Sequence, residues 1–327
     1  MGRINYPCYF CYECDFMKRN FEIVECKGSG HPDTLTDTIV EDCATALELW
    51  YKNSYGKVLH YNLDKAVFLS GRTVVNYGGG KVMHPPKFIL GGQAELYSEF
   101  VLEDSIRRTV KRVLPHLERF DIEIHTNSMS PNLKHITDQN LCNDTSFGVG
   151  YFPVSNMEIG VLLLKGTLDT IVKTHSDRCP IGEDYKIMAT PKGIMVSAPL
   201  YANKVRSADE YKRIKARLER ILGVTFNPDF DPDYPYLTLC GSSIECGDDG
   251  QVGRGNRYNG LITPCRPMSM EAYCGKNNQT HIGKLYNKMA YEKAVEMYLD
   301  TGKYTEVYLV GKIGKPINDY EMYVYHE

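Results

Sequence analysis

Between residues 247 and 257 the chain reads Gly-Asp-Asp-Gly-Gln-Val-Gly-Arg-Gly-Asn-Arg, with four glycines, two adjacent acids and two arginines. Glycine lets the backbone turn sharply and approach a ligand closely. The planar guanidinium group of arginine can pair with two phosphate oxygens at once. Adjacent aspartates can hold Mg²⁺ or a ribose hydroxyl. The stretch therefore predicts a phosphate-binding loop, although a charged, glycine-rich surface turn would have the same composition.

A second stretch lies upstream, where residues 25–33 read Glu-Cys-Lys-Gly-Ser-Gly-His-Pro-Asp. Proline suits the first turn of a helix, where its missing N–H needs no partner. The pattern predicts a helix from Asp33 to about Lys52, and we interpret Asp33, beside His31 and Lys27, as a metal or phosphate contact. A plain helix cap is the alternative. The apolar side chains that recur every four residues in this helix are Leu35, Ile39, Cys43 and Leu47.

Both stretches resemble the signature sequences of archaeal-type S-adenosylmethionine synthetases. The similarity continues in order from about residue 21 to about residue 316. The further matching segments lie at residues 60–64, 78–80, 143–151, 259–264, 266–272, 275–277 and 281–284. Segments of this length are specific, so the chain is identified as a member of that family.

The fold expected for the chain is of the α+β class, because the predicted helices and strands mix without strict alternation. The resemblance implies three structurally similar α+β repeats in one compact chain, with active sites shared within a dimer. It divides the chain, approximately, into an N-terminal extension and three interleaved repeats: residues 1–20, 21–125, 126–235 and 236–327.

Periodicity and turn residues predict the individual elements. Residues 58–62 and 66–70 are rich in β-forming side chains around a short polar link, which predicts a hairpin. Pro115 should end the helix that contains it early. Further helices are predicted at 104–119, 208–222 and 281–299, and strands at 122–124, 187–200 (one or two, around a turn at Pro191), 236–241 and 305–310.

The resemblance implies an unusual reaction. In this family the sulfur of methionine attacks C5′ of ATP and displaces the whole triphosphate, which is then hydrolysed to pyrophosphate and phosphate. A thioether carries no proton, so no general base is needed, and the sequence shows no Ser-His-Asp arrangement. Catalysis must then come from cations and from alignment of the substrates. Mg²⁺ is the expected cofactor, with K⁺ as a further candidate.

The resemblance assigns three sets of site residues. The candidate catalytic residues, expected to meet the charge of the leaving polyphosphate, are His31, Lys186, Arg254 and Lys276. The candidate substrate-binding residues are Glu25, Lys27, Asp144, Asp248, Arg257, Ser128, Ser130 and Asn132. The candidate metal ligands are Asp33, Asp64 and Asp249.

The chain departs from the family where the nucleotide should be covered. The family has Gly-Gln-Gly-Ser-x-Asp there, and residues 127–132 read Asn-Ser-Met-Ser-Pro-Asn. The lost groups could read a base edge, so ATP is the first candidate and another nucleotide such as CTP is the alternative. The third alternative for the function is a weakly active, nucleotide-binding subunit that partners an active synthetase. Cys26 stands where the family has arginine, which we expect to remove one phosphate-facing charge.

Composition limits the kinds of partner that the protein is expected to bind. A net charge of −3 over 327 residues argues against a nucleic-acid surface, and no apolar run is long enough to cross a bilayer. We expect a cytoplasmic homodimer or dimer of dimers that binds a nucleoside triphosphate and L-methionine. Eleven scattered cysteines suggest reduced thiols. The triplet Cys8, Cys11 and Cys14 has spacing that could bind a metal, although an accidental thiol cluster is the simpler interpretation.

Overall fold

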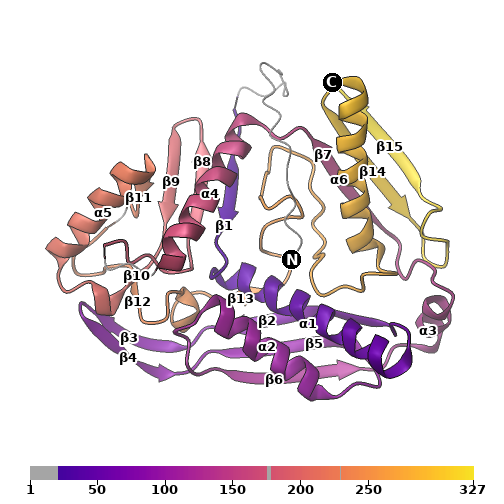
Figure 1. Ribbon diagram of the computed structural model, residues 1–327, viewed down its shortest axis with the longest axis horizontal. Helices are drawn as coiled ribbons and strands as arrows, with labels where there is room; N and C mark the ends of the chain where they lie inside the picture. Colours follow the sequence, from indigo (N-terminus) through magenta and orange to yellow (C-terminus); the bar gives the residue numbers. More distant parts are fainter. Residues whose placement is uncertain (1–20, 175–177, 229) are drawn as a thin grey trace.

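The computed structural model describes residues 21–174, 178–228 and 230–327 (Figure 1). Within these residues, three larger β-sheets with their helices form three units that surround the middle of the view in Figure 1. Each unit has its own buried apolar cluster. The expected α+β class is confirmed. The predicted extension, including Cys8, Cys11 and Cys14, lies outside the described residues.

The first unit, at the bottom of Figure 1, is a sheet covered by helices α1 and α2. Its strand order is β13-β2-β5-β6. The side chains of α1 that were predicted to be apolar and periodic are all fully buried against this sheet. The bounds are α1 Pro32–Tyr55, β2 Tyr61–Leu69, β5 Lys87–Ala94, α2 Glu99–Val113, β6 Asp121–Asn127 and β13 Gly250–Gln251. The predicted helix at 33–52 is confirmed, and α2 ends two residues before Pro115, as expected.

The second unit joins the start of the chain to its middle. Its strand order is β1-β8-β9-β11, so β1 pairs with a strand some 160 residues further along. The predicted turn at Pro191 separates β8 from β9, and the helix predicted at 208–222 is present with those bounds. The bounds are β1 Val24–Lys27, α4 Asn156–Thr174, β8 Lys186–Thr190, β9 Gly193–Ser197, α5 Ala208–Leu222 and β11 Thr225–Phe226.

The third unit packs α6 on a sheet of order β15-β14-β7. Glycines in β7 allow the close approach: a Cβ on Gly148 would lie 2.1 Å from a backbone carbon of Tyr286, and one on Gly150 would lie 2.2 Å from the backbone nitrogen of Tyr291. This explains two glycines of the segment at 143–151 by packing. The bounds are β7 Ser146–Phe152, α6 Ile282–Thr301, β14 Thr305–Gly311 and β15 Glu321–His326.

Shorter elements connect these units. Two small sheets pair β3 with β4 and β10 with β12, and α3 follows β6. Since β1, β7 and β13 each lie in a sheet formed mainly by another part of the chain, the units interlock. The repeat boundaries near residues 125 and 235 stay a prediction. The bounds are β3 Arg72–Asn76, β4 Gly79–His84, α3 Pro131–Asp138, β10 Leu200–Tyr201, the 3₁₀ turns Ala202–Lys204 and Ser243–Glu245, and β12 Leu237–Thr238.

Two local predictions are wrong. The expected hairpin at 58–62 and 66–70 is one strand, β2, with a bulge between Asn62 and Lys65. The polar link does not turn the chain, because Asp64 points inward and pairs with a buried lysine. The strand expected at 236–241 is only two residues long, since the chain turns at once into the loop that precedes the glycine-rich stretch.

Candidate active site

Two lysines face each other where β1 and β8 pair. Lys27 and Lys186 are direct partners in the antiparallel register, so their side chains leave the same face of the sheet. Glu25 lies on that face as well, because residues two apart in a strand point the same way. Its Oε1 is 3.8 Å from Nζ of Lys27 and 3.2 Å from Nζ of Lys186. One carboxylate thus contacts both ammonium groups.

His31 caps α1 with a bond that fixes its tautomer. Its Nδ1 accepts a hydrogen bond from the backbone N–H of Asp33 at 3.2 Å. Burial, together with the charge of Lys27, lowers the pKa of His31 to about 4, so the ring is neutral near pH 7. Since Nδ1 accepts, the proton of the neutral ring lies on Nε2. That Nε2 is 3.9 Å from Oδ2 of Asp248, beyond a hydrogen bond, so its N–H is available to a ligand.

The glycine-rich stretch packs on the start of α1. Asp33 accepts a hydrogen bond from Gln251 N at 2.9 Å, while its other oxygen is 2.9 Å from Nζ of Lys27. Asp37 accepts from Gly253 N at 2.7 Å and from Gly255 N at 3.0 Å. Burial raises the pKa of Asp37 to about 6. Asp37 therefore anchors the loop, and the first turn of α1 determines where the loop runs.

A cavity of about 330 Å³ lies at this junction. His31, Lys186 and Asp248 line it, so three of the predicted residues come together. Asp184 also lines it and was not predicted as a site residue. Its carboxylate accepts bonds from the backbone N–H and the hydroxyl of Ser243, and burial raises its pKa to about 6. It stands within the segment around Lys186, but nothing in the sequence marks it as buried.

Lys276 and Asp64 form a second centre. Nζ of Lys276 is 2.5 Å from Oδ2 of Asp64 and 3.4 Å from Oε1 of Glu271, and both members of the first pair are buried. Although burial opposes the effect, Lys276 lowers the pKa of Asp64. These residues line a different cavity, of about 580 Å³, together with Lys65 and His125. The predicted set is thus divided between two cavities.

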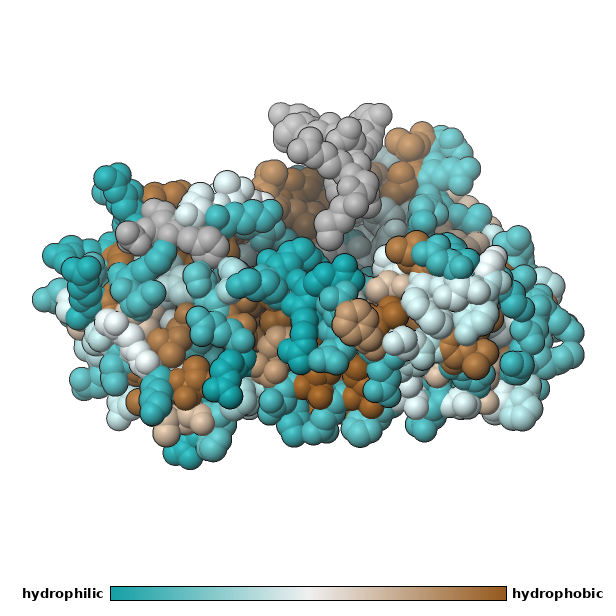
Figure 2. Space-filling model, turned by 60° about the horizontal axis from the view of Figure 1, so that its bottom comes forward, coloured by the Kyte–Doolittle hydropathy of each residue, from teal (hydrophilic) through white to brown (hydrophobic). Residues whose placement is uncertain are grey.

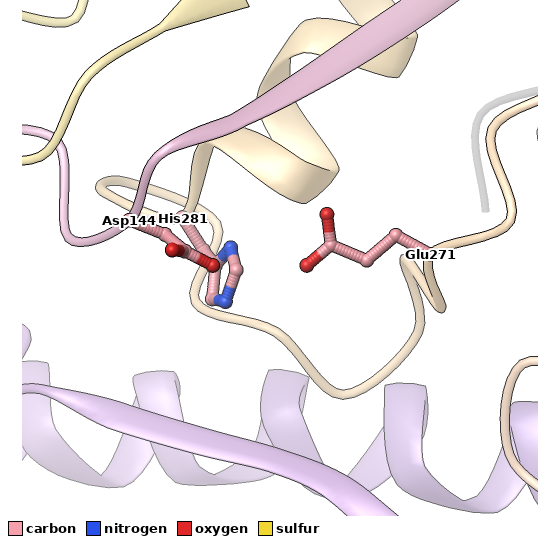
Figure 3. Close-up of side chains that lie close together, drawn as sticks. All are labelled: Asp144, Glu271 and His281. Carbon is pink, nitrogen blue, oxygen red and sulfur yellow. The ribbon is translucent and has the colours of Figure 1, made fainter.

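Asp144, Glu271 and His281 come together at the start of α6. One ligand atom from each lies within 4.8 Å of the others. Figure 3 shows the carboxyl group of Glu271 pointing toward the imidazole of His281, with the carboxyl group of Asp144 beside that ring. Only Asp144 was predicted. Glu271 and His281 stand in the matching segments at 266–272 and 281–284, so the signal was present but was not assigned.

The remaining predicted residues lie at the edges of these centres. Arg254 is exposed, and its carbonyl oxygen accepts a 2.7 Å bond from Nζ of Lys27. Arg257 is half-buried, with Nη2 donating to the carbonyl of Gly253 at 2.8 Å. Three exposed residues, Ser128, Ser130 and Asn132, follow β6, where Oγ of Ser130 caps α3 by accepting from Leu133 N at 3.3 Å.

The predicted metal ligands do not share one place among the described residues. Asp64 is paired with Lys276, and Oδ1 of Asp249 accepts from Ser70 N at 2.7 Å. Asp33 lies close to Asp248: burial and then the charge of Asp33 raise the pKa of Asp248. Two carboxylates that repel each other fit a divalent cation between them, so Asp33 and Asp248 suit Mg²⁺ better than the predicted set does.

Comparison with known proteins gives one consistent answer. A family model described as S-adenosylmethionine synthetase (AdoMet synthetase) matches residues 11–325. The S-adenosylmethionine synthase of Hyperthermus butylicus is 36% identical over 346 residues, covering 92% of this chain and 84% of that protein. That of Thermoplasma acidophilum is 37% identical over 339 residues, covering 92% and 84%.

A solved structure agrees on the fold. An S-adenosylmethionine synthetase from Campylobacter jejuni, described as unusual, matches with a TM-score of 0.59 at 16% identity, over 93% of this chain and 80% of that one. The mixed α+β fold and the sequence likenesses define an enzyme of the transferase class. The chain belongs to the archaeal-type S-adenosylmethionine synthetase family, as the sequence predicted. None of the helices in the described ranges is both long and apolar enough to span a membrane.

Proposed function

We propose that the enzyme transfers the nucleoside group of ATP to L-methionine. The S–C5′ bond forms as the C5′–O bond breaks, and the electron pair of the broken bond leaves with tripolyphosphate. The product is S-adenosylmethionine, a sulfonium ion. Tripolyphosphate is then hydrolysed to pyrophosphate and phosphate. The observation that best supports this proposal is the neutral His31, whose Nε2–H faces a cavity that Lys186 lines, in a chain of this family.

His31 would act on the leaving group. The bridging oxygen gains negative charge only as the C5′–O bond breaks, so a donor aimed there stabilises the transition state more than bound ATP. A neutral imidazole donates without neutralising the phosphate beforehand. The cap bond from Asp33 N keeps the ring oriented before substrate arrives, so no reorganisation is needed during the reaction.

Lys27 and Lys186 would bind the triphosphate. Both leave one face of the β1–β8 pair, and Glu25 limits their mutual repulsion when no ligand is bound. A polyanion that enters can take over the role of Glu25 and leave that carboxylate to contact methionine or ribose. Arg254, exposed on the adjoining loop, is a further cation within the same region.

Mg²⁺ is the proposed cofactor, held by Asp33 and Asp248, with Asp249 nearby in the chain. When bound there, Mg²⁺ would neutralise charge on the polyphosphate oxygens. Lys27, which now contacts Asp33, would then be released toward phosphate. K⁺ is proposed as a second cation without an assigned set of ligands.

A homodimer would join the two cavities. Lys276 and Asp64 line a different cavity from His31 and Lys186, so one complete site could combine one cavity from each of two chains. Figure 2 shows apolar patches between hydrophilic side chains on one face of the protein. Patches of this kind often mark subunit contacts. The exposed apolar residues on β2, β3 and β4 are Leu69, Val74, Val82 and Met83. A dimer of dimers is the larger proposed assembly.

The cytoplasm is the proposed location. The eight cysteines in the described ranges are all free thiols, and five of them are buried. Free thiols persist in a reducing compartment.

A second nucleotide is supported by the exposed segment after β6. Ser128 and Asn132 stand where the family has glutamine and aspartate, and the hydroxyl of Ser130 is engaged in capping α3. Recognition of an adenine edge therefore has fewer partners in this segment. CTP, which would give an S-cytidyl analogue of the product, is the alternative substrate.

One experiment tests both proposals. The protein is incubated with L-methionine, Mg²⁺ and ATP, CTP, GTP or UTP separately, and the sulfonium product is identified by mass. Analysis of phosphate products shows whether tripolyphosphate is cleaved before release. We expect S-adenosylmethionine from ATP. No sulfonium product with any nucleotide would contradict the proposed reaction and favour a nucleotide-binding subunit.

A further inference from the structure

His281 begins α6 in the way that His31 begins α1. Its Nδ1 accepts the backbone N–H of Gly283 at 3.2 Å, the same distance as in the His31 cap. Burial, followed by the charge of Lys276, lowers the pKa of His281 to about 3, so the ring is neutral near pH 7. With Nδ1 accepting, the ring proton lies on Nε2. Both helices thus begin with a neutral imidazole that presents an N–H.

The Nε2–H of His281 has no protein partner among the described residues. The residue as a whole is only 3% exposed, but Nε2 is not among the fully buried unpaired atoms, so its N–H can still be reached by a ligand. Two atoms on adjoining residues are fully buried and unpaired: Oδ1 of Asn143, which precedes Asp144, and Oγ1 of Thr280, which precedes His281. Unpaired polar atoms on three buried residues at one helix start indicate a place where a further group binds.

The charges around His281 restrict what that group is. A metal ion on Nε2 would need the proton on Nδ1, and the bond from Gly283 N would then be lost. Lys276 already places its ammonium group 3.4 Å from Glu271, while Asp144 has no lysine or arginine within ion-pair distance among the described residues. An anionic oxygen accompanied by a cationic group would satisfy both Nε2–H and Asp144.

We propose that His281 contacts substrate, with its Nε2–H donating to an anionic oxygen of the bound substrates. This inference rests on the proposed function, which supplies two such oxygens: the phosphates of the nucleotide with their Mg²⁺, and the α-carboxylate of methionine with its ammonium group. The shared chemistry is a charge-assisted hydrogen bond from a neutral imidazole. His281 would be a second histidine of the site, in addition to His31.

Two substitutions distinguish the role of His281 as a hydrogen-bond donor from its role as a helix cap. In His281→Asn the side-chain oxygen can still accept from Gly283 N, because asparagine is a good cap, but the side chain is too short to place a donor at the position of Nε2. In His281→Gln the amide nitrogen can reach the position of Nε2, but the cap is weakened. A control, Ser207→Ala, removes the hydroxyl that caps α5, a helix none of whose residues lines either cavity.

The affinity for each probe is measured by isothermal titration, once with inorganic tripolyphosphate plus Mg²⁺ and separately with L-methionine. The contribution of the helix cap to stability is measured by Tm. We expect His281→Asn to keep Tm near that of the wild type and to lose about tenfold or more in affinity for one probe. His281→Gln should recover much of that affinity while Tm falls, and Ser207→Ala should lower Tm alone. The probe that is affected identifies the oxygen as phosphate or carboxylate.

Two results would overturn the inference. One is wild-type affinity of His281→Asn for both probes, which would leave His281 as a helix cap only. The other is the absence of binding of either probe to the wild type. Failure of the proposed reaction is a separate result, because it appears as missing sulfonium product in the wild-type enzyme whatever these affinities are.

Discussion

Lys27 and Lys186 lie directly opposite each other on β1 and β8, and they come from parts of the chain about 160 residues apart. The antiparallel pairing brings their ammonium groups to one face, where Glu25 contacts both. Cys26, between Glu25 and Lys27, points the other way and is fully buried in the second unit. The expectation that the cysteine removes a phosphate-facing charge is therefore wrong, because position 26 faces the core.

Lys186→Met should weaken nucleotide binding. The substitution keeps the aliphatic stem and removes the ammonium group that lines the cavity with His31. We expect the KM for the nucleotide to rise about tenfold or more, with the KM for methionine little changed. Lys192→Met, in the exposed turn that follows β8, is the matched control. Equal kinetics for the two variants would remove Lys186 from phosphate binding.

His31→Asn should lower kcat far more than it raises the KM for methionine. Asparagine can keep the cap to Asp33 N, so the start of α1 should stay folded, while the Nε2–H aimed at the cavity is lost. Loss of one donor that acts in the transition state costs about a hundredfold or more in kcat. His31→Ala, which removes cap and donor together, should lower Tm as well. Near-normal kcat in His31→Asn would exclude His31 from the chemical step.

Asp37 should make the free energy of unfolding of the protein depend on pH. Burial raises its pKa to about 6, against 3.8 in the unfolded chain. The folded protein therefore holds the proton more tightly, and this contribution to stability is complete below pH 3.8 and is lost as the pH rises through 6. Relative to Asp37→Asn, which does not titrate, the wild type should lose about 2–3 kcal/mol between pH 4 and pH 7. Chemical denaturation of both proteins at several pH values measures this difference in unfolding free energy. If the free energies of the two proteins change with pH in parallel, the prediction is contradicted.

The sequence predicts those parts of the fold that depend on local periodicity. The helix at 208–222 matches because its apolar spacing and its serine cap agree. The bulge in β2 was missed because it depends on Asp64 reaching Lys276, more than two hundred residues away. Long-range pairs of this kind leave no pattern in a short window of sequence.

The candidate site, like the fold, was predicted only where it does not depend on long-range contacts. The signature sequences shared with the family were enough to select His31, Lys186 and Asp248, which the fold brings to one cavity. They did not show that Arg257 turns to the carbonyl of Gly253, or that Asp37 is the anchor of the loop. Burial decides between these roles, and burial is a property of the assembled units.

Mixed dimers should test whether two chains share each site. Asp33→Asn disables the first cavity. Lys276→Met together with Asp64→Asn disables the second without leaving a buried charge unpaired. Each variant alone should be nearly inactive. After dissociation and reassembly at equal amounts, we expect about a quarter of wild-type activity, because half of the dimers are mixed and each has one intact site. No recovery in verified mixed dimers would show that both cavities serve the same chain.

The segment after β6 should determine how strictly the enzyme selects ATP. A site that hydrogen-bonds a base rejects other bases because its own polar groups would be left unpaired. Ser128 and Asn132 stand where the family has glutamine and aspartate, so these groups are missing here. We expect the ratio of kcat/KM for ATP to that for CTP to be below about a thousandfold, which corresponds to roughly 4 kcal/mol. The variant Ser128→Gln with Asn132→Asp should raise the ratio at least about tenfold, since a restored polar group penalises the wrong base. Ser128→Ala with Asn132→Ala, which adds no such group, is the control. A wild-type preference for ATP above that limit, unchanged in both double variants, would show that residues outside this exposed segment select the base.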